Sequence, residues 1–433
     1  MKTLQVLAAL TLLAAGVTPA YGGVEAYECR GMPATIVGGP DLPSAELKGT
    51  EGDDVIVSNG SLTVEGFGGN DTICVTGDRS TGTWAGAGND VVDASALPAS
   101  AMSEVVLGGG DDTYLGHSGT DRVTTDLGSY SAAVGRGSDT VRTGDGRDFV
   151  DTGMEGLPDE DTIDVGAGDD FVRMRGTSTG SISITGASGR DKVQWPWSGG
   201  PRQWTFDNRQ GRVTRGGVVV GEWTGLEDFD LLSLSNHDVD FIGSDQAEAV
   251  RVSRYFGAQT GSIRAAMAGG DDLLWVNASQ QLVLDGGSGR DGLDYRAATA
   301  NDPAVTMDLR AGSVIRGGTV VGRSTSFEDA VLTAPRLSRL IGTRGPNELM
   351  LRACHGRVDG LRGNDRLVTS TKGMTCSGSS VKGAQLYGGP GDDRLYGSTY
   401  RDRLIGGTAR DTANGGPSSD LCRAERRTSC ERR

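Results

Sequence analysis

Apolar residues recur along this chain in groups of two or three, each placed just after a glycine and an aspartate. The core pattern is Gly-x-Asp-x-apolar, which occurs thirteen times between residues 52–56 (GDDVI) and residues 391–395 (GDDRL). The groups are too short for helices and follow turn-forming residues, so they indicate short strands separated by tight turns. A strand of about three residues buries its apolar side chain only against a neighbour, so the pattern predicts stacked coils.

The spacing of the pattern sets the size of a coil. Residues 107–151 divide into the nonapeptides LGGGDDTYL, GHSGTDRVT, TDLGSYSAA, VGRGSDTVR and TGDGRDFVD, of which only the third lacks a sixth-place aspartate and has Tyr130 instead. Elsewhere the aspartates often lie close to two nonapeptides apart, as Asp54 and Asp71 do. A coil of two strands and two turns fits this spacing. Stacking then brings residue i near residue i+18, so we expect Asp121 to face Asp139.

The repeated aspartates are candidate metal ligands. Glycines at the first, second and fourth places of the nonapeptide allow the positive φ values that a tight turn needs. The sixth-place carboxylate then projects among turn carbonyls, and such an all-oxygen cavity suits calcium better than zinc or copper. The candidate calcium ligands are Asp54, Asp71, Asp90, Asp112, Asp121, Asp139, Asp148, Asp170, Asp191, Asp272, Asp291, Asp365, Asp393, Asp402 and Asp411.

The nonapeptide resembles GGxGxDxUx, the repeat of the RTX or haemolysin-type calcium-binding family, and GGPGDDRLY and GGSGRDGLD are nearly complete matches. The resemblance runs from about Gly49 to Cys422. The segments ECRGMPATIVGG and DLCRAERRTSCERR are also similar to the ends of secreted calcium-binding repeat proteins of actinobacteria. The resemblance implies an all-β fold, a right-handed parallel β-roll or β-helix solenoid, with Ca²⁺ between successive turns and folding that depends on it. Unlike family toxins and proteases, this chain shows no separate effector domain.

Composition and charge agree with cations as partners. The chain has 433 residues, 70 of them glycine, and a formal net charge of −15. That charge argues against nucleic acid or an anionic membrane surface as a partner. Aspartate outnumbers glutamate by 42 to 15, which favours acidic turns over acidic helices.

The N-terminus predicts export. Residues 1–22 combine a lysine, an apolar run and small residues, which is typical of a signal peptide cleaved near residues 20–23. We therefore expect a soluble, secreted, extracellular protein. In such a compartment the six cysteines form disulfides, and sequence proximity favours pairing Cys29 with Cys74, Cys354 with Cys376 and Cys422 with Cys430 among the 15 connectivities that are open.

The middle of the chain contains a longer duplication. Residues 205–229 align with residues 306–330 at a constant offset of 101, and the alternation in VTRGGVVVG predicts a hairpin-like excursion or a wide coil. We expect an N-terminal cap at 23–48, a calcium-binding β-roll at 49–198 and the duplicated units at 199–350. C-terminal roll repeats follow at 351–421, and a disulfide-fastened cap at 422–433.

Three local features have two interpretations each. Trp195, Trp197 and Trp204 either form an aromatic platform for a sugar or cover a coil face. Glu227 with Asp228, and Glu328 with Asp329, resemble catalytic pairs, but neighbouring strand residues point to opposite faces.

Arg147, Arg190 and Arg290 stand beside candidate ligands and are expected to compete with calcium for them. The stretch 387–422 has lost its fourth-place glycine at Tyr400, Ala409 and Ser418, so we expect weaker ion binding there than at Asp121 and Asp139.

The sequence as a whole favours an exported, non-enzymatic calcium-binding repeat protein with a structural or adhesive role, whose partners are calcium ions and a glycan or cell surface. The alternative is a polysaccharide lyase or epimerase on a β-helix with structural calcium.

Overall fold

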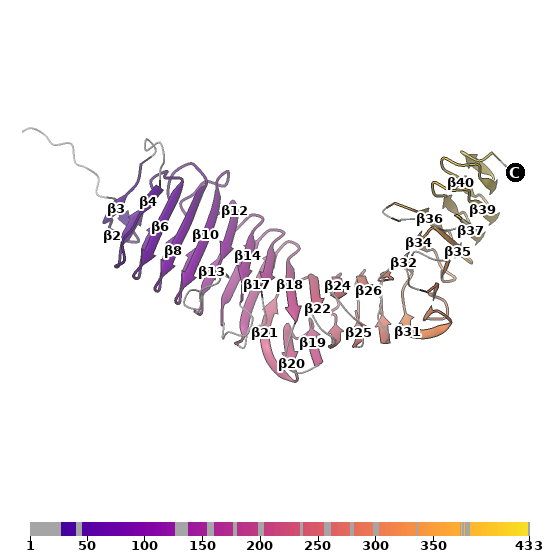
Figure 1. Cartoon of the computed structure of the whole chain (residues 1–433), viewed down its shortest axis with the longest axis horizontal. Helices are drawn as coiled ribbons and strands as arrows, with labels where there is room; N and C mark the ends of the chain where they lie inside the picture. The colour runs from indigo at the N-terminus through magenta and orange to yellow at the C-terminus, as the bar shows by residue number, and fades with distance from the viewer. Residues whose placement is uncertain are drawn as a thin grey trace, which may run out of the picture.

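The computed structural model describes residues 27–39, 46–125, 137–153, 160–175, 180–197, 203–233, 237–254, 261–277, 281–297, 303–334, 337–372, 374, 376 and 382–431. These residues form strands and turns, with no helix among them. The described residues wind as one elongated, curved solenoid, with β3 near one end and β40 near the other (Figure 1). The expected all-β roll is confirmed. In the described ranges no helix is long and apolar enough to cross a membrane.

Each coil contributes one strand to each of two parallel sheets, and strands of successive coils pair side by side. The first sheet contains β4 (Glu46–Lys48), β6 (Thr63–Gly68), β8 (Thr81–Ala87), β10 (Met102–Gly109), β12 (Thr120–Thr124), β14 (Phe149–Thr152), β16 (Phe171–Met174), β18 (Lys192–Trp197), β22 (Asp228–Ser233), β24 (Ala249–Arg254), β26 (Leu273–Asn277), β28 (Gly292–Arg296), β32 (Asp329–Thr333), β34 (Glu348–Arg352), β36 (Arg366–Ser370), β38 (Arg394–Tyr396), β40 (Thr412–Asn414) and β42 (Arg426–Thr428).

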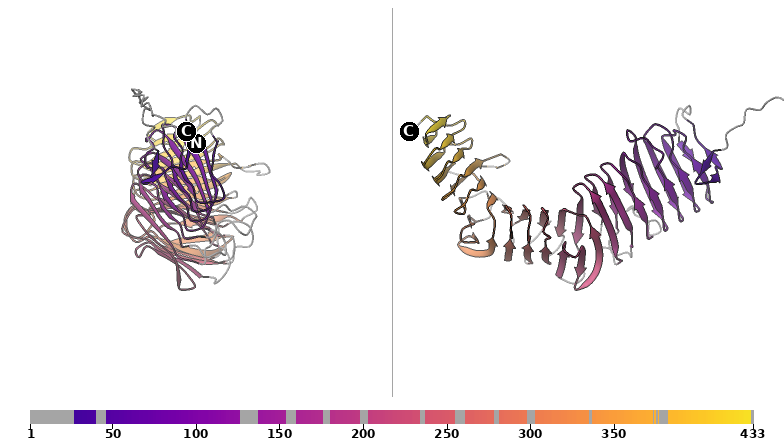
Figure 2. Two further views of the ribbon diagram at one scale, coloured as in Figure 1. Left: turned by 90° about the vertical axis from the view of Figure 1, so that its left-hand side faces the viewer. Right: turned by 180° about the vertical axis from the view of Figure 1, so that it is seen from behind.

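The second sheet contains β3 (Ile36–Val37), β5 (Val55–Val57), β7 (Thr72–Cys74), β9 (Val91–Asp93), β11 (Thr113–Leu115), β13 (Thr140–Arg142), β15 (Thr162–Ala167), β17 (Ile182–Ser188), β19 (Gln203–Asp207), β20 (Arg212–Arg215), β21 (Val218–Thr224), β23 (Asp238–Ile242), β25 (Ser262–Ala266), β27 (Gln281–Asp285), β29 (Val305–Asp308), β30 (Ser313–Arg316), β31 (Thr319–Thr325), β33 (Ser338–Ile341), β35 (His355–Asp359), β37 (Gly383–Pro390), β39 (Arg403–Thr408) and β41 (Leu421–Arg423). Figure 2 shows the stacked strands from behind.

The core is a column of inward side chains between the two sheets. In the first sheet Val105, Val123, Val150, Val172 and Val193 stand in register on successive coils, and each is almost fully buried. Flanking strand residues point outward, so each short strand buries one or two apolar side chains. Stability therefore comes from stacking neighbours, as the repeat pattern predicts.

The duplicated units form hairpins. Strand β20 pairs antiparallel with β19 and β21, and β30 pairs in the same way with β29 and β31. Gly216 and Gly217 adopt φ values of 59° and 86° at the tip of the first hairpin, which fits a two-residue turn of type I′. Of the two expected forms, the chain adopts the hairpin.

The tryptophan-rich segment belongs to the core. Trp195 is 3% exposed and Trp204 is 1% exposed, and both rings pack against Phe206. The sugar-platform interpretation is therefore wrong for these two residues, because the hairpin closes over their rings. The side chain of Trp197 lies outside the described set.

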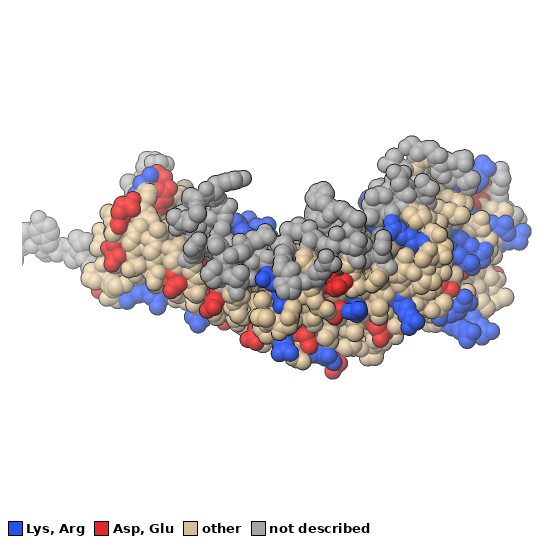
Figure 3. Space-filling model, turned by 60° about the horizontal axis from the view of Figure 1, so that its bottom comes forward, with Lys and Arg blue, Asp and Glu red and all other residues tan. Residues whose placement is uncertain are grey.

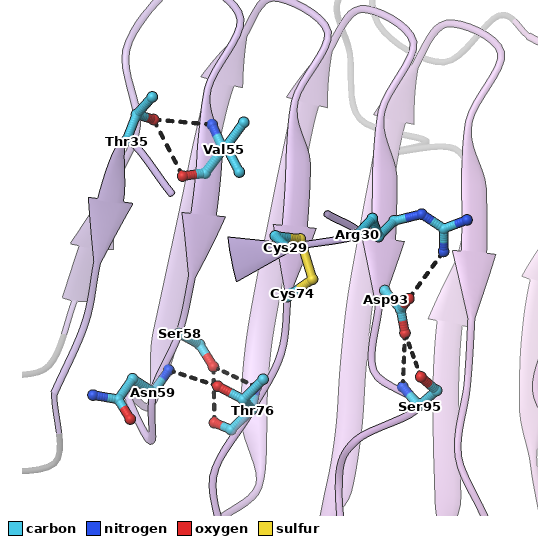
Figure 4. The surroundings of a disulfide bond; sticks show 10 residues. All are labelled: Cys29, Arg30, Thr35, Val55, Ser58, Asn59, Cys74, Thr76, Asp93 and Ser95. Atoms are coloured by element: carbon cyan, nitrogen blue, oxygen red, sulfur yellow. Dashed lines mark hydrogen bonds and ion pairs between the residues drawn. A yellow bond between two sulfur atoms is a disulfide. The ribbon is translucent and has the colours of Figure 1, made fainter. Parts of the chain in front are cut away.

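All three predicted disulfides are present: Cys29 with Cys74, Cys354 with Cys376, and Cys422 with Cys430. The first joins β1 (Glu28–Cys29), which pairs with β2 (Met32–Pro33), to β7 of the roll (Figure 4). Arg30 beside it donates to Asp93 at 2.9 Å. These contacts fasten the N-terminal segment to the first coils.

Candidate functional site

The repeat aspartates lie inside the roll. All fifteen predicted ligands are buried, with exposures between 0% and 7%. Each lies at the start of a strand or directly before one, where the tight turn ends. Since a buried carboxylate is costly unless it is paired, hydrogen-bonded or protonated, the contacts of these groups decide their role.

One oxygen of each carboxylate joins consecutive coils. The backbone N–H of Asp71 donates to Oδ1 of Asp90, and the N–H of Asp148 donates to Oδ1 of Asp170, both at 2.8 Å. The same bond recurs along both edges of the roll at 2.7–3.0 Å and forms what we call the carboxylate ladder.

Among the described residues the ladder consists of five runs. Their members, in order, are Asp54, Asp71, Asp90, Asp112, Asp139 and Asp161; Asp121, Asp148, Asp170, Asp191 and Glu227; Glu248, Asp272, Asp291 and Glu328; Asn347, Asp365, Asp393, Asp411 and Glu425; and Asp402, Asp420 and Glu431.

The second oxygen distinguishes two classes among the ladder members, although not every member belongs to one of them. In the open class, Oδ2 is buried and accepts no hydrogen bond from any described residue. Its members are Asp71, Asp90, Asp148, Asp170, Asp272, Asp291, Asp365, Asp393, Asp411 and Asp420. All of them lie inside a run rather than at its start. Buried acceptors are normally satisfied, so this recurrent orphan oxygen indicates a ligand that the protein chain does not supply.

In the closed class, a local backbone N–H occupies the second oxygen. It comes from the residue four places earlier: from Thr50 to Asp54 at 2.7 Å, from His117 to Asp121 at 3.0 Å, and from Ser398 to Asp402. Ser244 donates in the same way to Oε1 of Glu248, whose Oε2 is buried and accepts no hydrogen bond from a described residue, and Thr343 donates to Oδ1 of Asn347. These five residues are the first members of the five runs, so no earlier ladder member donates its N–H to their side chains.

The backbone of the second-place residue separates the two classes. Four places before every open aspartate stands a residue with positive φ: Phe67, Gly86, Gly144, Gly166, Ala268, Gly287, Leu361, Gly389, Gly407 and Gly416. None of the five capping residues has a positive φ. In the turns with positive φ, the N–H of the second-place residue does not cap the open aspartate. The N–H of Gly166, for example, donates to the side chain of Asp164. Turn conformation thus decides whether this backbone N–H caps the carboxylate.

The first-place glycine provides the space around the open oxygen. A Cβ on Gly66 would lie 2.4 Å from Oδ2 of Asp71 and 2.1 Å from the carbonyl oxygen of Ala85 in the next coil. A Cβ on Gly388 would lie 2.1 Å from Oδ2 of Asp393 and 2.6 Å from the carbonyl oxygen of Gly406. Carboxylate and carbonyl oxygens therefore converge where only glycine leaves room. Within the described ranges no three His, Cys, Asp or Glu side chains form a metal cluster, so backbone carbonyls would supply the remaining ligands.

Burial raises the pKa of the open carboxylates. Desolvation raises the pKa of Asp90, Asp148, Asp272 and Asp393 to about 7, despite the N–H bond to each ladder oxygen. It raises the pKa of Asp71, Asp170, Asp291 and Asp365 to about 6. Without a cation, ionised carboxylates in these positions are held at a cost.

Asp121 and Asp139 do not face each other, so this prediction was wrong. The N–H of Asp121 donates to Asp148, and that of Asp139 donates to Asp161, because β12, which contains Asp121, and β13, which follows Asp139, belong to different sheets. Most of the nonapeptide containing Tyr130, residues 126–133, lies outside the described residues, and strands pair 27 residues apart across it.

The Asp121 carboxylate is also fully engaged. Oδ1 contacts the hydroxyl of Tyr114 and Nδ1 of His117, each at 2.7 Å, and both side chains are buried. The 387–422 stretch, in contrast, contributes Asp393, Asp411 and Asp420 to the open class, so the geometry does not support weaker ion binding there than at Asp121. Ala409 there adopts a φ of 97° and keeps the turn that its lost glycine would form.

Glutamates end four of the five runs. Glu227 accepts the N–H of Asp191 at 2.9 Å after the first hairpin, and Glu328 does so for Asp291 after the second. The neighbouring Asp228 instead forms an ion pair with Arg190 at 2.6 Å.

Arg290 pairs with Asp329 in the second unit, and Arg147 is exposed and forms no ion pair with a described residue. The expected competition of these arginines for the ligand aspartates is therefore wrong, since the guanidinium groups face outward.

An all-oxygen set of buried carboxylates and carbonyls fits a hard cation such as calcium. A family model of the RTX calcium-binding nonapeptide repeat matches residues 132–155, 154–173 and 387–422, with four copies. The chain carries RTX-type calcium-binding repeats. A search of curated proteins found no significant match. The last of these RTX matches covers the open Asp393 and Asp411.

Several ladder members were missed from the sequence. Asp161 lacks the glycine two places earlier, and the terminal Glu425 and Glu431 lie in the cap rather than in a repeat. The sequence does contain a signal for the closed class: Ser, Thr or His stands at the second place of the nonapeptide in all five closed positions.

Proposed function

We propose that this protein binds calcium at the open positions of the carboxylate ladder, and that binding is coupled to folding of the roll. The observation that carries the proposal is the set of ten buried Oδ2 atoms that accept no hydrogen bond from a described residue. Calcium would neutralise the carboxylates and bind the neighbouring carbonyl oxygens, as its preference for six to eight oxygen ligands requires.

The coupling to folding follows from the position of the ligands. The open carboxylates come from turns that approach one another only when coils stack, so an unfolded chain holds no preformed site. Binding free energy therefore adds directly to the free energy of folding. Without calcium, each ionised open aspartate opposes stacking.

The wider role that we propose is that of an exported, non-enzymatic structural or adhesive protein. Three disulfides support an oxidising compartment, and the signal-like residues 1–22 lie outside the described residues. Glu227 and Asp228 resembled a catalytic pair in the sequence. Glu227 accepts a ladder hydrogen bond and Asp228 forms an ion pair with Arg190, which supports a structural role for both.

A thermal unfolding comparison tests the proposal. The mature chain is measured in 5 mM calcium, in 5 mM magnesium and in excess chelator, with circular dichroism as the readout. We expect calcium to raise the unfolding midpoint strongly and magnesium to raise it little, because magnesium demands a tighter octahedral site. Equal midpoints in calcium and in chelator would refute the proposal.

A further inference from the structure

The C-terminal part of the solenoid has the opposite charge from the rest. Residues 337–433 contain 17 Lys and Arg against 10 Asp and Glu, whereas residues 1–336 contain 25 against 47. Half of those ten acids are the buried ladder members Asp365, Asp393, Asp402, Asp411 and Asp420. The outer surface of this part is therefore strongly basic, and Figure 3 shows blue side chains gathered at this end.

The arginines of the last coils differ from those before them in having no ionic partner among the described residues. Before the last coils, exposed arginines are often paired, as Arg190 is with Asp228 and Arg357 with Asp359. In the last coils seven exposed arginines form no ion pair with a described residue: Arg394, Arg401, Arg403, Arg410, Arg423, Arg426 and Arg427. Arg394 also stands directly opposite Arg366 in the strand register, an arrangement of like charges that costs stability. An external anion would relieve this repulsion.

Three of these arginines line one cavity. Arg394, Arg410 and Arg426 belong to three successive coils on the first-sheet side, and they border a space of about 510 Å³. Four acids also line it. Asp392 accepts the N–H of Arg410 and Glu425 accepts that of Asp411, while Asp393 and Asp411 are open ladder members whose charge the proposed calcium would neutralise. Arg394 and Arg426 lie at the same register position on β38 and β42, with Thr412 of β40 between them, and Arg410 lies in the turn before β40. Because neighbouring parallel strands lie about 4.8 Å apart, the three arginines follow one another along the solenoid axis.

The geometry points to a linear acidic polymer as the partner. A polymer lying along the axis would meet cations on successive coils, and arginine forks bind carboxylate or sulfate groups with two hydrogen bonds. Single-stranded nucleic acid is disfavoured because the nearby rings are covered: Arg357 lies 4.2 Å from the ring of Tyr387, and Arg366 lies 4.6 Å from that of Tyr396. No uncovered platform for bases remains at these two rings.

We propose that the C-terminal arginine surface binds a linear acidic polysaccharide bearing repeated carboxylate or sulfate groups. The inference goes beyond calcium binding, and it uses arginines rather than ladder carboxylates. Calcium binding and polysaccharide binding can therefore be tested separately in one protein. A variant that loses polysaccharide binding but keeps calcium binding reports on the arginine surface alone.

The test measures binding of the calcium-loaded mature chain to heparin and to polygalacturonate by biolayer interferometry at two salt concentrations. The variant R394Q/R410Q/R426Q is compared with R142Q/R147Q/R212Q, which removes the same charge from exposed arginines elsewhere. We expect salt-sensitive binding to at least one polymer that weakens tenfold or more in the first variant and less than twofold in the second. Calcium stoichiometry serves as the folding control.

Three results would overturn the proposal: no binding to either polymer, equal losses in the two variants, or binding to duplex DNA alone. Self-association of the unmodified chain that the first variant abolishes would instead assign the surface to a second copy. If R394Q/R410Q/R426Q fails to fold, the single substitutions R403Q and R410Q replace it, and binding unchanged in both would count equally against the proposal.

Discussion

The backbone N–H of Asp393 donates to Oδ1 of Asp411 at 3.0 Å, eighteen residues later, while Oδ2 of Asp393 accepts no hydrogen bond from a described residue. One residue thus both joins two coils and presents a free oxygen to the space between them. This double role fits the constant nine-residue step of Asp393, Asp402, Asp411 and Asp420. It also makes Asp393 the natural position for the first prediction.

Replacing Asp393 by Asn should remove bound calcium, whereas replacing Asp402 by Asn should not. Both carboxylates are buried, but the second oxygen of Asp402 is capped by the N–H of Ser398. Isothermal titration calorimetry should therefore show a lower stoichiometry in D393N, by at least one ion, and an unchanged stoichiometry in D402N. An equal loss in both variants would contradict the division into open and closed positions.

Tyr114→Phe should destabilise the protein without changing calcium binding. The Tyr114 hydroxyl donates to the buried Asp121 carboxylate, and its removal leaves that oxygen short of a donor, which costs about 1–3 kcal/mol. Tyr387→Phe is the control, because its hydroxyl contacts Gln385 near the surface and its loss should cost about 0.5 kcal/mol or less. Chemical denaturation in calcium measures both. A larger cost for Y387F than for Y114F would speak against the buried cluster.

Ala409→Gly should stabilise the protein. Ala409 is exposed and has a φ of 97°, a left-handed conformation that costs a non-glycine residue roughly 1–2 kcal/mol. Glycine removes this strain and loses more chain entropy on folding, so we expect a net gain of about 1 kcal/mol. Ala96→Gly, at an exposed site without positive φ, should be neutral or slightly destabilising. The same sign for both substitutions in thermal unfolding would contradict the strain argument.

The calcium-free protein should lose stability as pH rises through the pKa range of the open carboxylates. Burial raises the pKa of Asp90 and Asp393 from 3.8 to about 7, so the folded state binds more protons than the unfolded state between these values. The stability that this contributes is complete below pH about 4 and is lost by pH about 7. Calcium binds the ionised form, so its stabilising effect should grow in the same window.

Differential scanning fluorimetry at pH 4.5 and pH 7.5, with calcium and with chelator, checks this dependence. In chelator the midpoint should be lower at pH 7.5 than at pH 4.5, and the increment from calcium should be larger at pH 7.5. A calcium increment independent of pH would contradict the titration of the open carboxylates.

The sequence predicted the roll and its disulfides because both depend on short-range spacing. Each Gly-x-Asp-x-apolar unit specifies its own turn and strand, and Cys354 and Cys376 are close along the chain. The stacking of Asp121 could not be read in this way. Its partner depends on how the chain passes the nonapeptide around Tyr130, which a constant step of eighteen residues ignores.

The division of the ladder into open and closed positions could not be predicted from the sequence, for a different reason. It depends on φ at the second place, where Phe67 and Leu361 adopt the left-handed conformation that a glycine would normally occupy. A sequence pattern predicts a negative φ for such residues. The strain of the positive φ is compensated by the stacking of the coils, which local sequence preference does not reveal. The capping residues Thr50 and Ser398 were readable, but only once the second oxygen was known to matter.

The most direct test of calcium binding by the ladder is the number of ions bound by the whole mature chain, measured by native mass spectrometry after exchange into calcium and again after chelation. The account predicts on the order of ten bound ions, because each open carboxylate contributes to a site, and loss of the β signal in circular dichroism as they are removed. A chain that binds one or two ions, or that keeps its fold and midpoint when all are removed, would contradict it.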